Sequence, residues 1–464
     1  MNYKFNGSGF KIILIIGLFL CLSLGPLAGR LWSQQNQIES ILTEVINHLA
    51  RRDFKTALEL FDTLPPEEAE KTQIQIMRAS ILNSAGRTAE ARRIADSIIA
   101  KDSRNTEAMM VLADAAAIDN RERDRRAVLD GIIRIDPAHA RALNDLGNIS
   151  ISNKNLRAAA GYFDRAIAAE PENGEALVGR ATVHRYNGET RSAERLLNRA
   201  ISLYPDWARP LHERARLYMS SVYYADALED LNAAIELEPQ NYWMLTDRGI
   251  VLMELQRREE ALASFNRAIS IEPGIFMAYV YSAGIKDELG DYEGAERDYT
   301  ILARLNPEYF YAFEALGVIR MRNKQWASAR DAFLDAYKQA PREYSYAILA
   351  AINWMRAGRQ TDPKQFLSQV LRTAPRDSLD YAMLRLFHDL SGDADVTRRV
   401  ETEINNPTKS RMLFYLASYF DIRGSKTLAD RYYLMVRDLD TPASIEWRLN
   451  EAVLKDRGLV PEKK

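Results

Sequence analysis

Three basic residues are spaced so that one helix would place them on the same face. Arg209, His212 and Arg216 lie at i, i+3 and i+7, and residues with this spacing are neighbours on a helix surface. Such a basic cluster could bind a carboxylate or another acidic group of an extended partner. Glu175 and Glu213 are near in the sequence, so a solvated or internally paired face is the alternative interpretation.

The residue types that usually carry catalysis or metal binding form no motif here. The single cysteine, Cys21, excludes internal disulfides and any cysteine-based zinc site. No phosphate-binding glycine loop or nucleophile elbow is present. None of the histidines has the spacing of a two-histidine metal site; they are His48, His139, His184, His212 and His388. The sequence therefore predicts no enzyme activity, no metal and no cofactor.

The composition indicates an ordered, soluble protein. Hydrophobic residues make up 47 % of the 464 residues and charged residues 27 %, which excludes wholesale disorder. Lys and Arg total 62 against 64 Asp and Glu, so the net charge is −2. This balance excludes a globally basic nucleic-acid binder.

Proline recurs with a strict period of 34 residues. Eight of the 16 prolines share this register, at positions 137, 171, 205, 239, 273, 307, 341 and 375. With this proline as position 32 of a unit, the register runs back to Ile38 and gives ten units. A fixed period of this length is typical of repeat proteins.

Other positions of the unit repeat as well. Position 20 is alanine in eight of the ten units, and position 24 is apolar in all ten; being four residues apart, they share one helix face. Position 8 is mostly small, and glycine recurs near position 15, as Gly86, Gly188, Gly290 and Gly358. Each unit is therefore predicted to be a helix, a tight turn and a second helix closed by the proline.

This pattern resembles the tetratricopeptide repeat (TPR). The unit from Ala140 matches the family pattern best, with Leu143, Leu146, Gly147, Ala159, Phe163, Ala166 and Pro171. The resemblance covers about residues 38–442 and implies an all-α, right-handed α-solenoid of about twelve helix pairs with a C-terminal capping helix. It implies a protein-binding scaffold but not a particular process, because the family serves in many.

The resemblance also implies a concave groove, lined by positions 2, 5, 9, 12 and 13 of each unit. These positions add Arg185 to the basic cluster. They also contain an apolar stripe, which consists of Met219, Trp243, Ile250, Met253, Met277, Val280, Val318, Met321, Ile352 and Met355. A surface of adaptable methionine and aromatic side chains suits a partner's apolar helix or strand. Ordinary packing between helices is the alternative, and Asp287 interrupts the stripe.

Arginine repeats at position 7, as Arg180, Arg214 and Arg248. This position is expected to face the paired helix rather than the groove. Asp230, at position 23 of the Arg214 unit, is the natural buried partner. We therefore interpret these arginines as structural.

The organisation along the chain follows from these patterns. Residues 1–33 are predicted to be a signal peptide or an N-terminal membrane anchor, residues 34–443 the repeat superhelix, and residues 444–464 a charged capping helix and polar tail. The register is strict over 38–377 and irregular over 378–443. Pro363 at position 20 predicts a second helix that starts late, and a further unit is expected to begin at Ser410 after Pro407.

The N-terminal segment indicates export. Lys4 and Lys11 precede an uncharged run over residues 12–29, the arrangement of an export signal. If it is not cleaved, its 18 residues would span about 27 Å as a helix, just short of the ~30 Å hydrocarbon core. Export of a chain without disulfides favours a bacterial periplasm or cell envelope, with the inner membrane as the place of an uncleaved anchor.

These inferences lead to a non-enzymatic envelope scaffold that binds a segment of another envelope protein in its groove. A structural subunit that uses its convex face or helix edges is the alternative, because many tyrosines lie near unit boundaries. A receptor for a small cell-wall fragment is a further alternative and would need a closed pocket. No nucleic acid is expected as a partner, and the membrane only through residues 12–29.

Overall fold

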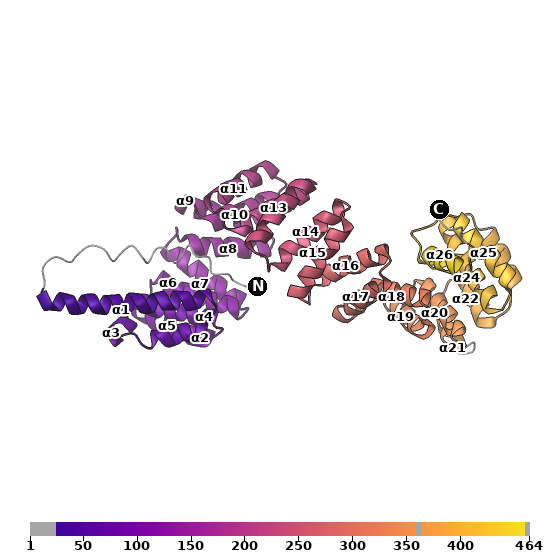
Figure 1. Ribbon diagram of the computed structural model, residues 1–464, viewed down its shortest axis with the longest axis horizontal. Helices are drawn as coiled ribbons and strands as arrows, with labels where there is room; N and C mark the ends of the chain where they lie inside the picture. Colours follow the sequence, from indigo (N-terminus) through magenta and orange to yellow (C-terminus); the bar gives the residue numbers. More distant parts are fainter. Residues whose placement is uncertain (1–24, 359–362, 460–464) are drawn as a thin grey trace. The chain divides into compact units, whose positions relative to one another are not determined.

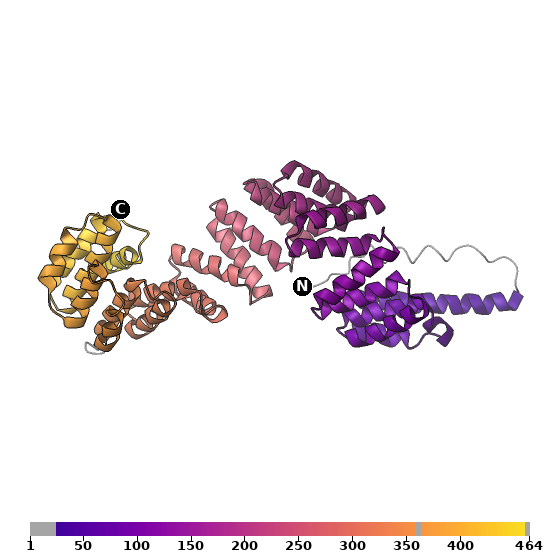
Figure 2. The same cartoon turned by 180° about the vertical axis from the view of Figure 1, so that it is seen from behind.

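The computed structural model describes residues 25–358 and 363–459, with side chains from residue 37 onward. Every regular element in these ranges is a helix, and consecutive helices pack in pairs (Figures 1 and 2). The prediction of an all-α fold built from helix pairs is therefore confirmed. The chain forms two compact units, with the boundary in the sequence between Pro205 and Asp206.

The helices of the first unit are α1 (Gly25–Ala50), α2 (Phe54–Phe61), α3 (Pro66–Ala69), α4 (Thr72–Ser84), α5 (Thr88–Lys101), α6 (Thr106–Ile118), α7 (Glu122–Ile135), α8 (Ala140–Ser152), α9 (Leu156–Ala169), α10 (Gly174–Tyr186) and α11 (Thr190–Leu203). Those of the second unit are α12 (Ala208–Ser220), α13 (Tyr224–Leu237), α14 (Tyr242–Glu254), α15 (Arg258–Ile271), α16 (Phe276–Leu289), α17 (Tyr292–Leu305), α18 (Phe310–Arg322), α19 (Trp326–Gln339), α20 (Tyr344–Arg356), α21 (Pro363–Val370), α22 (Leu379–Asp389), α23 (Asp393–Glu401), α24 (Asn406–Ile422), α25 (Lys426–Asp438) and α26 (Ile445–Asp456).

The turn inside each repeat requires a left-handed residue at position 15. The four glycines predicted there have φ between 75° and 81°. The other six units place a non-glycine residue at the same position with positive φ, namely Arg52, Asn120, Lys154, Val222, Gln256 and Lys324. The backbone of the repeat thus dictates this conformation whatever the side chain, and at Val222 a β-branched residue adopts it at φ 64°.

Aromatic residues at position 24 pack against backbone made accessible by glycine. Phe163 of α9 is fully buried, and its ring faces Gly147 of α8 and Gly179 of α10. A Cβ atom added to Gly147 would lie 2.6 Å from this ring, and one added to Gly179 would lie 2.3 Å from it. Glycine is required here because any side chain would enter the space of the ring.

In the irregular C-terminal repeats, two prolines lie at the start of a helix, whereas the proline of each regular repeat follows the end of one. α21 begins at Pro363 and has only eight residues, as the sequence predicted. Pro407 was expected before a helix starting at Ser410, but α24 begins at Asn406 with the proline in its first turn. That prediction was wrong because proline is well tolerated at the start of a helix, where its missing N–H is not needed.

The predicted export segment is described only at its end. Its residues 1–24 lie outside the described residues, and residues 25–33 belong to α1. Within the part of the chain that the structure describes, no helix combines the length and the apolar character needed to cross a membrane.

Candidate functional site

Three large apolar side chains are exposed on consecutive repeats of the second unit. Trp243 of α14, Met277 of α16 and Tyr311 of α18 all occupy position 2 of their repeats, and 54 %, 47 % and 54 % of their surfaces are exposed. We call these three residues the apolar row. Trp243 and Met277 were predicted in the stripe. Tyr311 was not, although its repeat position would have identified it.

Four further stripe residues belong to α12, α14 and α16 of the same unit. Ile250, Met253 and Val280 belong to α14 and α16, and Met219 belongs to α12; all four are half-buried. Their remaining exposure allows an incoming side chain to contact them. Seven apolar residues of α12 to α18, counting the row, are therefore accessible at least in part.

The other four predicted stripe residues are not accessible. Val318 and Met321 of α18 and Ile352 and Met355 of α20 are at most 7 % exposed, and they belong to a core cluster that includes residues of α24 and α26. The prediction that they line an open groove is wrong, because helices from the C-terminal end of the chain pack on α18 and α20.

Two residues of the basic cluster are already bound to a carboxylate of the protein itself. Nε2 of His212 lies 2.7 Å from Oδ2 of Asp247, and Nε of Arg216 donates to the same oxygen over 2.8 Å. Burial raises the pKa of Asp247, but the hydrogen bonds from His212 and Arg216 and their charges outweigh this effect and leave it below its usual value. Asp247 therefore takes the place that a partner's carboxylate was expected to fill at these two residues.

The two remaining residues of the basic cluster each lie near an aromatic ring. The guanidinium carbon of Arg209 is 6.0 Å from the centre of the Trp207 ring, and that of Arg185 is 4.6 Å from the centre of the Tyr186 ring. Arg185 belongs to the first unit and Arg209 to the second. Both are half-buried, so their role as contacts for an acidic partner stays a prediction.

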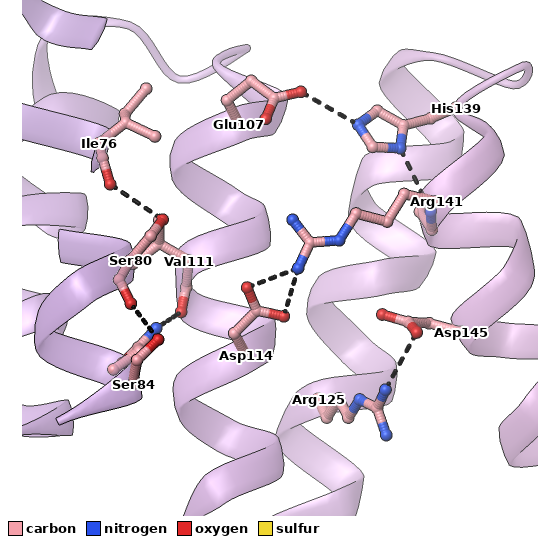
Figure 3. A network of polar contacts seen from close by, with 12 residues as sticks. Ile76, Ser80, Ser84, Glu107, Val111, Asp114, Arg125, His139, Arg141 and Asp145 are labelled. Carbon is pink, nitrogen blue, oxygen red and sulfur yellow. Dashed lines mark hydrogen bonds and ion pairs between the residues drawn. The ribbon is translucent and has the colours of Figure 1, made fainter. Parts of the chain in front are cut away.

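In the first unit, a network of polar contacts links α6 and α8 (Figure 3). One terminal nitrogen of Arg141 contacts both carboxylate oxygens of Asp114, at 3.0 and 2.8 Å. His139 lies 3.6 Å from Glu107. Burial raises the pKa of Asp114, although the charge of Arg141 opposes this shift. Arg141 and Asp114 neutralise one another across neighbouring repeats, which favours a structural role for the network.

Comparison with known families gives the same repeat. Residues 76–140, 125–174, 212–274 and 286–344 match one sequence model of the tetratricopeptide repeat, and residues 150–217 match a second. Together the matches cover more than half of the chain. The chain belongs to the tetratricopeptide repeat family.

Solved TPR structures match parts of this chain at low identity. A Pseudomonas aeruginosa pilF structure is 17 % identical, with a TM-score of 0.40 and coverage of 44 % of this chain and 92 % of that chain. YrrB, described as a TPR protein with an unusual peptide-binding site, is 21 % identical, with a TM-score of 0.31 and coverage of 40 % and 95 %. A Parabacteroides merdae TPR protein is 18 % identical, with a TM-score of 0.35 and coverage of 53 % and 98 %. Comparison with curated proteins gives no match.

Two position-7 arginines of this TPR chain, Arg214 and Arg248, bond inside their own helix pair, as predicted, whereas Arg180 pairs with Asp164 of the preceding repeat over 2.7 Å. Arg214 forms two hydrogen bonds of 2.6 and 2.7 Å with the buried carboxylate of Asp230. In the next repeat Arg248 donates to Ser264, which occupies the position of Asp230, over 3.1 Å. In these two repeats, positions 7 and 23 thus meet inside the helix pair.

The described residues offer no metal centre. No group of three or more histidine, cysteine, aspartate or glutamate residues among them is arranged to hold an ion. TPR units are protein–protein interaction scaffolds and are typically non-enzymatic.

Proposed function

We propose that this TPR protein is an exported scaffold of the bacterial cell envelope, and that it binds a segment of another envelope protein through the apolar row. The observation that carries the proposal is the repeated exposure of Trp243, Met277 and Tyr311 at one repeat position. Large exposed apolar side chains in one region of a soluble protein are typical of interaction sites.

The types of residue in the row support a binding role. Tryptophan and tyrosine are the side chains that most often dominate the energy of protein interfaces, and methionine adapts to the shape of different partners. Truncating such a residue at the centre of an interface typically weakens binding by about 2 kcal/mol or more, which is roughly thirtyfold. An extended partner segment could contact all three residues, because they recur with the period of the repeat.

The first experiment is crosslinking in cells with mass spectrometry. The variant Trp243→Ala/Tyr311→Ala should lose at least about nine-tenths of the crosslinks to its partner. The variant Tyr223→Ala is a matched control, because Tyr223 is 58 % exposed and lies in the turn after α12, outside the row. Crosslinks that persist in the row variant and are lost in the control would contradict the proposal and favour a structural subunit that uses its helix edges.

Arg209 is proposed as a secondary contact for an acidic group of the partner. The substitution Arg209→Glu should weaken partner binding, and the loss should shrink at high salt because exposed charges are screened. The thermal stability should change little, since the residue is half-buried beside Trp207 rather than in the core. Unchanged affinity at low salt would remove Arg209 from the proposed site.

The proposed location rests on the sequence of residues 12–29. Export would place the repeats in the periplasm, and an uncleaved segment would hold them at the inner membrane. Cell fractionation combined with N-terminal sequencing of the mature protein tests both points. Recovery of the full-length chain in the cytoplasm would refute the proposed export.

A further inference from the structure

The last helix of the chain, α26, lies against the surface that the sequence assigned to a partner. It contacts α18 as well as α24 and α25. Met321 of α18, which was predicted to be a groove residue, borders a cavity of about 40 Å³ together with Leu449 and Val453 of α26. The chain's own helix therefore occupies the end of the predicted stripe.

The contact has the form of an amphipathic helix docked in a groove. The α26 residues that line this cavity are Leu449, Ala452, Val453 and Asp456. They are spaced at i, i+3, i+4 and i+7 and so form one helix face. This is the spacing with which amphipathic helices present their anchors to a groove.

Charged pairs hold α26 at both ends of this face. Nη1 of Arg448 lies 3.2 Å from Oδ2 of Asp287 on α16, and Asp456 lies 2.9 Å from Nζ of Lys324, two residues after α18. Asp287, which interrupts the predicted apolar stripe, thus serves as the partner of a basic residue on a docked helix. The docked helix thus has a cation paired near one end of this face and a carboxylate paired at the other.

The docking of α26 leaves several polar groups poorly satisfied. The indole nitrogen of Trp447 and Oδ1 of Asn450 are buried without a hydrogen-bond partner among the described residues. The carboxyl group of Glu446 is also buried and shares a hydrogen bond with Tyr415 of α24. Buried polar groups without full compensation oppose docking, so α26 is held less firmly than an apolar helix of the same size would be.

We propose that α26 is a displaceable internal ligand, and that the surface of α16 and α18 binds an amphipathic helix of the partner in its place. This inference rests on the proposed function and specifies its partner. The partner helix carries apolar residues at i, i+3 and i+4 of this face, an acidic residue at i+7 opposite Lys324, and a basic residue opposite Asp287. Departure of α26 uncovers Met321 and extends the accessible apolar surface beyond Tyr311.

The docked state can be measured in the full-length protein without a partner. A zero-length carbodiimide crosslinker should join Lys324 to Asp456, and mass spectrometry should detect the product. The charge reversal Arg448→Glu places two carboxylates together and should increase hydrogen exchange in α26 by up to about fivefold. Lys455→Glu is the matched control, because Lys455 is exposed on the same helix and makes none of these contacts. Equal exchange in both variants would overturn the proposal.

Binding in trans tests the surface itself, with a labelled synthetic peptide of residues 443–459 as the probe. Val453→Asp puts a charge between α26 and α18, so this variant should bind the peptide at least about tenfold more tightly than wild type, in which the tethered helix competes. Adding Met321→Asp should abolish this gain. Circular dichroism establishes that both variants keep their helices.

The outcomes separate this inference from the proposed function. The proposal that α26 is an internal ligand is overturned if a folded Val453→Asp variant binds the peptide no better than wild type. It is also overturned if adding Met321→Asp leaves the peptide affinity of that variant unchanged. Loss of cellular crosslinks on mutation of the apolar row would still support the proposed function in that case. The peptide and crosslinking results depend only on this chain, so they stand even if no partner uses the row.

Discussion

Loss of one partner from the Lys286–Asp298 ion pair provides a quantitative test of how these repeats are held together. Nζ of Lys286 lies 2.6 Å from Oδ2 of Asp298, and Ser282 donates a hydrogen bond of 2.6 Å to the same oxygen. The two charged side chains are only 15 % and 9 % exposed. The pair joins α16 to α17.

The expected magnitude follows from burial. Asp298→Ala leaves the buried ammonium group without this carboxylate, and breaking a buried pair in this way costs about 3–5 kcal/mol. The control is Glu288→Ala, which removes the pair between Glu288 and Arg258, a pair of 2.9 Å whose side chains are 56 % and 40 % exposed. Exposed pairs contribute about 0.2–1 kcal/mol. The double variant Lys286→Met/Asp298→Leu removes both buried charges and should recover most of the loss.

Native-state hydrogen exchange is the suitable assay, because it reports on α16 and α17 directly, whereas one global transition would average over both compact units. A loss of about 3 kcal/mol corresponds to exchange faster by about a hundredfold in α16 and α17. The control should change exchange there by no more than about fivefold. Equal effects of Asp298→Ala and Glu288→Ala, or no recovery in the double variant, would refute the reasoning.

Three further changes test other features of the repeats. Gly179→Ala should destabilise α9 and α10 by about 1–2 kcal/mol, because the clash with Phe163 exceeds the gain in helix propensity. Gly284→Ala should instead stabilise α16 by about 0.5–1 kcal/mol, because nothing lies within 4 Å of the added Cβ. Hydrogen exchange measures both effects. Val222→Gly should raise stability by about 1 kcal/mol by relieving left-handed strain, and an unchanged melting temperature would show that this strain is absent. Burial raises the pKa of Glu446, although the hydrogen bond from the tyrosine of α24 and a nearby arginine oppose the shift. Its contribution to stability is therefore present below the unfolded-state pKa of about 4.5. That contribution is lost as the pH rises through the folded-state pKa. Glu446→Gln should therefore raise the melting temperature at pH 7 and have less effect at pH 4, and a larger gain at pH 4 would contradict this sign.

The repeat pattern was sufficient to predict the parts of the site that lie within one repeat. The pairing of Arg214 with Asp230 was predicted because the two residues fall on facing positions of a single helix pair, so the 34-residue period already defines their neighbours. The pairing of His212 with Asp247 crosses from one repeat to the next. It could have been found by asking which acidic side chain the following repeat brings to that face.

The burial of the last four residues of the apolar stripe could not be predicted from the repeat pattern. Local spacing assigns Val318, Met321, Ile352 and Met355 to the same repeat positions as the half-buried Ile250, Met219 and Met253. Nothing near them in the sequence distinguishes the two sets. Their burial depends on α24 and α26, which are distant in the sequence and follow the irregular repeats.

The sequence by itself determined the helices, the turns, the alanine and aromatic contacts between paired helices and the family, because all of these depend on short-range spacing within a repeated unit. Only the tertiary structure decided which groove residues are accessible and which carboxylates neutralise the basic cluster. The physical reason is that burial and charge pairing depend on every element that packs on a surface, including those that the period of the repeat does not describe.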